Sequence, residues 1–194
     1  MTDEKITQFS SVYNRFLGLI TDDMYLELTP EDTIRDLQNL LINAIPGFEF
    51  PRVNLYDYKI DVKEVDADGI TADDFVIGTV WGELDEELEN PTVLVDKSQF
   101  NIKLTEEEIG ILALLMKQGW VQRQVSSIEN IRMKYSGVDF KMTSQANHLS
   151  KLLVLLDECR RDSFHMQRLY KRRKLTSKGY ASNWSSIMEN SALD

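Results

Sequence analysis

The stretch from Leu104 to Lys174 constrains the fold of this chain more than any other part of the sequence. Its apolar residues recur every three or four positions in two long runs joined by a Gly-containing turn, which is the spacing of amphipathic helices. Thr105 and Glu108 form a capping box before the first run, and Thr143 can cap the second. We therefore predict two long helices, with the second continuing to about Lys174.

Within the first run, Gly119 is expected to kink or end the helix before Trp120 opens a further helical run. The stripe of the second run begins with leucines and becomes less apolar toward its end. Its beginning is therefore predicted to be core, while Ser163 to Lys174 projects toward a partner. Cys159, the only cysteine, is predicted to be a small buried residue on this helix. The predicted stripe comprises Leu149, Leu152, Leu153, Leu156, Cys159, Ser163, Met166 and Tyr170.

The N-terminal residues 1–53 predict a helical hairpin. Apolar residues at helical spacing mark a first helix over about 4–20. Thr29-Pro30 is typical of a helix start, because a threonine side chain can cap and proline needs no hydrogen-bond partner in the first turn. Pro46-Gly47 then ends the second helix.

Residues 54–103 have a different character and predict a small β-rich insertion or wing. Apolar and polar residues alternate up to Val62, and further strands are expected at 75–81 and 92–95, on either side of an acidic loop. Together with a long-helix core at 104–174 and a C-terminal arm at 175–194, the predicted fold class is mainly α. We expect a helical bundle with a long C-terminal helix and a small β-rich insertion.

Charge is spread unevenly along the chain, whose net charge is −10. Residues 1–103 contain 8 Lys+Arg and 22 Asp+Glu, a balance of −14, whereas residues 104–194 contain 14 and 10, a balance of +4. The two halves are therefore expected to meet different partners, or to stack against each other between subunits. The basic cluster comprises Arg160, Arg161, Arg168, Lys171, Arg172, Arg173 and Lys174.

This basic cluster is predicted to contact DNA phosphates or an acidic protein surface. The simpler alternative is that its cations complement the dipole at the C-terminal end of the helix. Seven cations within fifteen residues exceed what the dipole requires. The residues alone leave the choice between protein and DNA open.

No group of residues in the sequence predicts catalysis, a metal site or a cofactor. His148 and His165 would lie about 25 Å apart on one helix, too far to share a metal. Cys159 and His165 fall on nearly opposite faces of the same helix, and the acidic stretch 66–74 lacks the glycine and glutamate positions of a calcium-binding loop. No apolar run approaches the roughly 18–20 residues that span a bilayer. We therefore expect a soluble protein without enzymatic activity.

Four segments of the sequence resemble a virion neck protein of tailed bacteriophages, in the head–tail connector (adaptor or head-completion) group. They are LTEEEIGILALLMKQGWVQRQVSSIENI, YSGVDFKMTSQANHLSKLL, HMQRLYKRRK and, near the N-terminus, ITDDMYLELTPEDTIRDLQNLLINAIPGFEFPR. The resemblance covers most of the chain outside about 60–100. The β-rich 54–103 segment is larger than the smallest adaptors carry, so the position of this chain within a neck stays open.

The resemblance implies a structural protein of the virion neck, made in the host cytoplasm, that assembles into a homo-oligomeric ring, commonly a dodecamer. Its expected partners are the portal protein, another neck or tail protein, and double-stranded DNA passing through the lumen. A C-terminal arm would dock on the portal through Tyr180, Trp184, Ile187 and Met188. The alternative hypothesis is a helical DNA-binding or regulatory module that uses the basic segment 160–174.

Overall fold

A computed structural model describes residues 6–20, 25, 28–66, 75–76, 92–134, 143–176 and 179–182. The Gly137 turn, the acidic loop at 82–91 and three residues of the expected arm (Trp184, Ile187 and Met188) lie outside the described residues. The described part is mainly helical with a small β part, as the sequence predicts.

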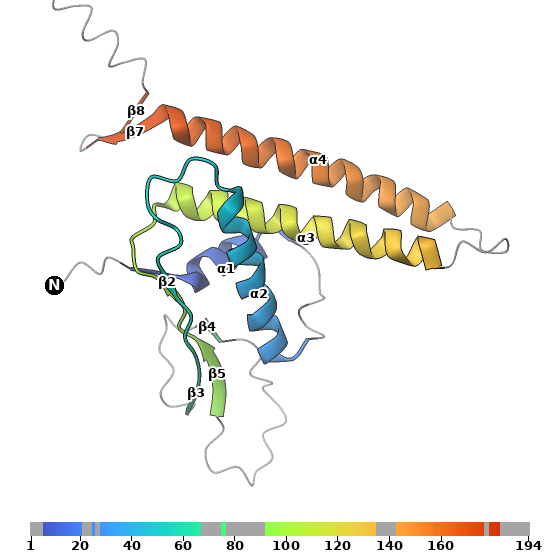
Figure 1. The fold of residues 1–194 in the computed structure, drawn as a ribbon, viewed down its shortest axis with the longest axis horizontal. Helices are drawn as coiled ribbons and strands as arrows, with labels where there is room; N and C mark the ends of the chain where they lie inside the picture. The colour runs from blue at the N-terminus through green and yellow to red at the C-terminus, as the bar shows by residue number, and fades with distance from the viewer. Residues whose placement is uncertain are drawn as a thin grey trace, which may run out of the picture.

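Two long helices dominate the molecule. Helix α3 (Glu106–Lys134) and helix α4 (Thr143–Arg172) lie side by side, and one end of the pair extends beyond the other elements (Figure 1). Helix α3 starts at the predicted capping box, in which the Thr105 backbone N–H donates to Glu108 Oε2 at 2.7 Å and the Glu108 N–H donates to Thr105 Oγ at 3.3 Å. The long helices predicted for this region are thus confirmed.

The prediction of a kink or helix end at Gly119 is wrong, because α3 runs through this position without a break. A glycine inside a helix destabilises it by about 1 kcal/mol relative to alanine. Packing on both sides of Gly119 offsets this loss, since Met116 and Val121 are fully buried. Leu40 lies against the open side of the glycine, where an added Cβ would be 3.6 Å from its Cδ2 atom.

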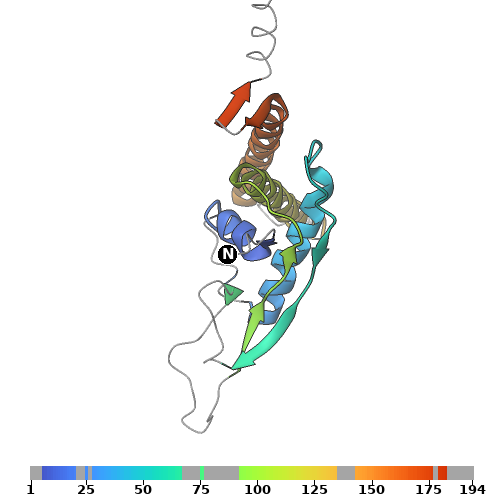
Figure 2. The ribbon, with the colours of Figure 1, turned by 90° about the vertical axis from the view of Figure 1, so that its left-hand side faces the viewer.

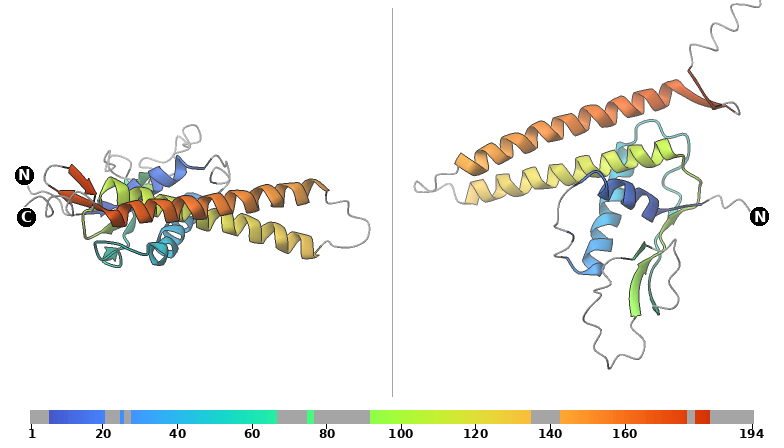
Figure 3. Two further views of the ribbon diagram at one scale, coloured as in Figure 1. Left: turned by 90° about the horizontal axis from the view of Figure 1, so that it is seen from above. Right: turned by 180° about the vertical axis from the view of Figure 1, so that it is seen from behind.

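The two N-terminal helices pack mainly against α3. Helix α1 (Phe9–Leu17) starts later than the expected 4–20 segment, because strand β1 (Thr7–Gln8) precedes it and pairs with a distant strand. Helix α2 (Pro30–Ala44) begins as predicted, with the Asp32 N–H donating to Thr29 Oγ at 3.2 Å, and ends in a short 3-10 turn η2 (Ile45–Gly47). The steep crossing of α2 relative to the α3–α4 pair is visible in Figures 1 and 3.

Apart from a C-terminal hairpin, the described strands form two small antiparallel sheets. The first has the order β1-β6-β2, with β2 (Tyr58–Lys59) and β6 (Gln99–Phe100) paired so that Tyr58 lies opposite Phe100. The second has the order β3-β5-β4 and comprises β3 (Val62–Asp66), β4 (Phe75–Val76) and β5 (Thr92–Asp96). Figure 2 shows this second sheet at the far end of the molecule from α4.

The first sheet belongs to the main core. Phe100 is fully buried against Phe9, with ring centroids 4.6 Å apart, and Leu55 lies in the same cluster. Part of the segment 54–103 therefore packs with α1, α2 and α3. One end of the second sheet also reaches this core, where the Phe75 ring lies 5.2 Å from the Tyr13 ring and the Tyr13 hydroxyl donates to Asp96, while its other end extends away (Figure 2). Only its strand β4 falls within the expected 75–81 strand, whose remaining residues lie outside the described part.

A second, smaller hydrophobic cluster holds the far part of α3 and α4 together. Cys159 is buried in it, as predicted, with Leu149, Leu156, Val121 and Val125. Leu153 was predicted to lie in the buried stripe, but 46% of it is exposed. Leu152 and Leu156 face α3. Because successive residues of a helix point in different directions, Leu153 points away from the contact between α3 and α4.

Candidate functional site

Five residues of the basic cluster lie on the C-terminal half of α4, and Arg173 and Lys174 follow directly after the end of the helix. This half of α4 has one buried and one exposed face. Ser163, Gln167 and Tyr170 are buried, and only 1% of Tyr170 is accessible. The prediction that Ser163 to Lys174 projects from the core is therefore wrong for this inner face. It packs on α3 and on the turn that follows α2, as the polar contacts below show.

Tyr170 joins the end of α4 to the start of α3. Its hydroxyl donates a hydrogen bond to Glu108 Oε1, and its ring contacts Phe48 with centroids 5.4 Å apart. The Arg52 guanidinium lies 4.1 Å from the centre of the same ring. Burial, and then the neighbouring Glu108 carboxylate, raise the pKa of Tyr170, so the phenol stays protonated. Glu108 thus caps the start of α3 and also accepts a hydrogen bond from the end of α4.

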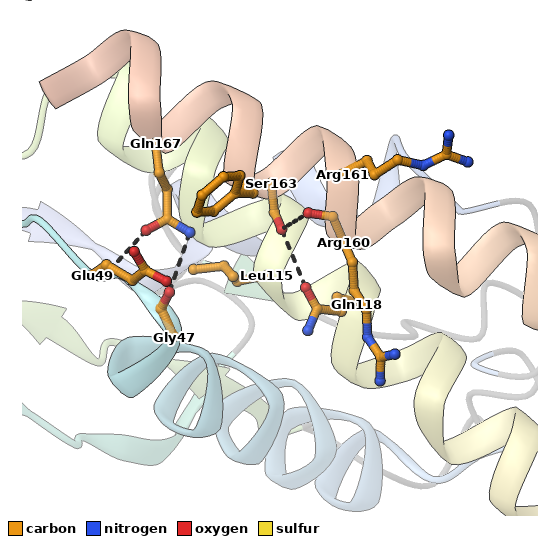
Figure 4. A pocket seen from close by; sticks show the side chains of 9 residues that line it. Gly47, Glu49, Leu115, Gln118, Arg160, Arg161, Ser163 and Gln167 are labelled. Carbon is orange, nitrogen blue, oxygen red and sulfur yellow. Dashed lines mark hydrogen bonds between the residues drawn. The ribbon is translucent and has the colours of Figure 1, made fainter. Parts of the chain in front are cut away.

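Gln167 and Ser163 make further polar contacts along the same seam (Figure 4). The Gln167 side-chain oxygen accepts from the Glu49 backbone N–H at 2.7 Å, and its amide nitrogen donates to the Gly47 carbonyl at 3.2 Å. Ser163 donates to Gln118 on α3. Because Gln167 satisfies a donor and an acceptor of the turn after α2, this turn and α4 are held in fixed register.

Three arginines of the predicted cluster have partners within the chain. Arg173 lies 3.2 Å from Glu107, a residue of the first turn of α3. Arg161 pairs with Asp157 one turn earlier at 3.1 Å, and Arg160 donates to the Gln122 side chain at 2.9 Å. Arg173 is only partly exposed, and its contact with Glu107 ties the end of α4 to α3.

Arg168 and Lys171 lie over aromatic rings on the outer face, where Phe164 is exposed and Phe50 is half-buried. Arg168 lies over the Phe164 ring, 5.6 Å from its centre, and Lys171 Nζ lies 4.0 Å from the centre of the Phe50 ring. A hollow of about 430 Å³ separates these groups, with Arg172 and Glu49 at its edge. We name this surface the basic–aromatic face and define it as Phe50, Arg161, Phe164, Arg168, Lys171 and Arg172.

The expected C-terminal arm begins as a β-hairpin. Strand β7 (Arg173–Thr176) follows α4 directly and pairs antiparallel with β8 (Gly179–Ser182), placing Lys174 opposite Ala181 and Leu175 opposite Tyr180. The expectation that 175–194 form a tail that orders against a partner is therefore wrong for 175–176 and 179–182, which are strand residues. Where the side chains of Lys174 and Tyr180 lie is outside the described part of the structure.

The described residues contain no group of three or more His, Cys, Asp or Glu side chains placed to hold a metal ion. Burial raises the pKa of the Cys159 thiol, which leaves it a poor nucleophile. His148 and His165 are both exposed on α4. None of the helices, as far as the structure describes them, is both long and apolar enough to span a membrane.

Two residues of the basic–aromatic face escaped sequence reasoning. Phe164 falls outside the predicted buried stripe. It directly follows Ser163, which belongs to the stripe, and neighbouring residues on a helix face different directions. This position was the available signal that the Phe164 side chain faces away from the core. Phe50 lies more than a hundred residues earlier in the chain, so no local pattern predicts its contact with Lys171.

Comparison with protein-family models, with curated proteins and with solved structures yields no match to this chain.

Proposed function

We propose that this chain is a structural virion protein that forms a ring in a phage neck, joins the portal to the tail and lets DNA pass. The observation that carries the proposal is the basic–aromatic face, an exposed surface on a helix whose opposite side is firmly anchored by Tyr170 and Gln167. A rigid surface with aromatic and arginine residues is typical of protein interfaces. The proposed activity is therefore assembly without catalysis.

The shape of the described part supports this proposal. The α3–α4 pair extends beyond the main core, which gives each protomer a long rigid element for contacts with neighbours. We propose that α1 and α2 complete a helical-bundle protomer around this pair. A ring, expected to be twelvefold, would then combine many weak contacts, because closure lets each one reinforce the others.

The C-terminal hairpin supports a docking role for the arm. A two-stranded hairpin is marginally stable alone in water and gains stability from a further strand or packed surface. β7 and β8 pair only with each other among the described strands. We propose that the hairpin and the residues beyond it, including Trp184, Ile187 and Met188, dock on the portal.

A DNA-binding or regulatory module is the second candidate. Arg168, Lys171 and Arg172 are exposed together at the end of one helix, an arrangement that can contact phosphates. In this alternative the monomer binds duplex DNA, and its affinity falls steeply with salt.

Reconstitution with portal rings tests the two candidates against each other. We expect the full chain to bind portal rings from the same virus in a defined number of copies, and removal of 183–194 to weaken this binding. R172E is a suitable probe of the basic–aromatic face, because Arg172 is exposed, whereas R173E would also disturb the contact with Glu107. Tight binding of the monomer to duplex DNA, with no affinity for portal rings, would contradict the neck proposal.

A further inference from the structure

Residues 58–66 form one continuous edge that runs through both small sheets. β2 and β3 pair with β6 and β5 in a single antiparallel register, from Tyr58 opposite Phe100 to Asp66 opposite Thr92. β6 and β5 each have a further partner on their other side, β1 and β4 respectively. β2 and β3 have no further partner among the described strands, so this edge of the ladder is open there.

The hydrogen bonds of this ladder indicate which backbone groups face the open edge. The carbonyls of Asp57 and Asp61 accept hydrogen bonds from the opposite segment at 3.0 and 2.7 Å, so these two residues face inward. Inward-facing and outward-facing residues alternate along an antiparallel strand, so the N–H and C=O groups of the even-numbered residues in 58–64 point outward. An open row of such groups is a template for pairing with another strand.

The side chains of this edge differ between its two faces. Ile60 and Val62 are apolar, yet they are 50% and 36% exposed. The alternate positions carry charges on the other face, where Asp61 lies 3.4 Å from Lys59 and 2.9 Å from Lys63. The side chains of both lysines remain more than half exposed, so they are accessible to an added strand as well.

Two copies of this edge fit each other when they run antiparallel with Ile60 at the centre. The outward-facing residues then meet, with Ile60 opposite Ile60 and Tyr58 opposite Val62 of the second copy. Apolar pairs directly opposite each other stabilise neighbouring strands. The exposed apolar side chains of each copy would thus be covered by those of the other.

The charges favour this register over the two neighbouring ones. With Ile60 at the centre, Lys59 lies opposite Asp61 of the second copy. Asp57 likewise lies opposite Lys63. A centre at Asp61 would place Lys59 opposite Lys63, and a centre at Lys59 would place Asp57 opposite Asp61. Like charges directly opposite each other destabilise a pair of strands, so only the centre at Ile60 sets opposite charges together on both sides.

We propose that the 58–66 edge pairs with the same edge of a second copy, so that the sheets of the two molecules continue across a two-fold axis at Ile60. The contact covers an open edge that would otherwise invite aggregation. An isologous contact of this kind closes after two copies, whereas a ring needs two different surfaces that meet head to tail. The pairing is therefore a separate contact and does not rest on the proposed neck ring.

Disulfide trapping of full-length variants tests the register of this contact. Ile60→Cys puts a thiol on the two-fold axis, where opposed Cα atoms are about 5.5 Å apart and a disulfide can close. We expect this variant to form covalent dimers under mild oxidation. Tyr56→Cys is the matched control, because Tyr56 is 65% exposed and directly precedes the same edge. Its equivalent in the second copy would lie about 26 Å away, so few dimers should form.

Charge reversal and its repair supply a second measurement. Sedimentation equilibrium of the unmodified chain should show monomers and dimers. K59D sets acids opposite each other and should weaken dimerisation by about tenfold or more, whereas K59D/D61K restores opposite charges and should bring it back to within about threefold. K151E reverses an exposed cation on α4 and should change dimerisation by less than about twofold. Circular dichroism should show an intact fold in each variant.

Several results would overturn the inference. These are a chain that stays monomeric at high concentration, equal trapping of Ile60→Cys and Tyr56→Cys, or equal weakening by K59D and K59D/D61K. Slow hydrogen exchange at the backbone amides of Ile60 and Val62 in the dilute monomer would show that the chain itself covers this edge, which would also overturn it. The proposed function is decided separately, because a chain that fails all of these tests can still be found in virion necks, and a dimer can form in a chain that is absent from virions.

Discussion

Tyr170→Phe tests whether the start of α3 and the end of α4 are joined as described. The change removes the hydroxyl that donates to Glu108 Oε1 but keeps the ring against Phe48 and Arg52. A hydrogen bond to a charged group contributes about 1.5–3 kcal/mol. Glu108 is only 2% exposed, so water cannot readily replace the lost donor, although its Oε2 atom keeps the contacts with Thr105. We therefore expect the free energy of unfolding to fall by about 2 kcal/mol.

Urea denaturation followed by circular dichroism measures this loss. With an m-value of about 3 kcal/mol/M, the midpoint should fall by about 0.7 M while the m-value stays unchanged. Tyr56→Phe is the matched control, because Tyr56 is 65% exposed and its loss should change stability by less than about 0.5 kcal/mol. Equal midpoints for the two variants would refute the proposed junction. Glu108→Gln combined with Tyr170→Phe in a double-mutant cycle would assign the energy to this pair.

Two further predictions concern the α3–α4 seam and the buried phenols. Leu156→Ala should lower the free energy of unfolding by about 2–5 kcal/mol, because Leu156 is buried between α3 and α4. The control Leu153→Ala removes an exposed side chain and should change it by about 0.5 kcal/mol or less. Similar losses for the two variants in thermal unfolding would contradict the described contact between α3 and α4. Burial and adjacent carboxylates raise the pKa values of Tyr13, Tyr25 and Tyr170, so these phenols keep protons that the unfolded chain releases above a pH of about 10. Stability should therefore decline as pH rises past this value, as measured by urea midpoints, and an unchanged midpoint at higher pH would argue against the burial of these groups.

The helices were predictable because the residues that cap them and the apolar residues of their buried faces lie close together in the sequence. Thr29 and Thr105 cap α2 and α3 through bonds to residues three positions ahead, so the sequence contains both partners. The buried position of Cys159 followed from its spacing relative to Leu156 in the same way. Gly119 was misjudged because the contact with Leu40, which comes from another helix, decides its environment.

The candidate site was only partly predictable for the same reason. The basic residues of α4 were evident from composition, but the inner face of this helix is fixed by Glu108, Glu49 and Gly47, which are distant in sequence. Similarly, Tyr170 seemed part of a charged helix end, whereas a buried acceptor for its hydroxyl places it in the core. Long-range polar partners of this kind leave no periodic pattern.

The central claim is that this chain forms a ring in the neck of a virion. The most direct measurement is imaging of the neck in purified virions of the virus that encodes it, with mass spectrometry to count the chain relative to the portal protein. The account predicts a ring between portal and tail, with a copy number that is a multiple of six, expected to be twelve. Absence of the chain from purified virions, or its presence only outside the neck, would contradict the account.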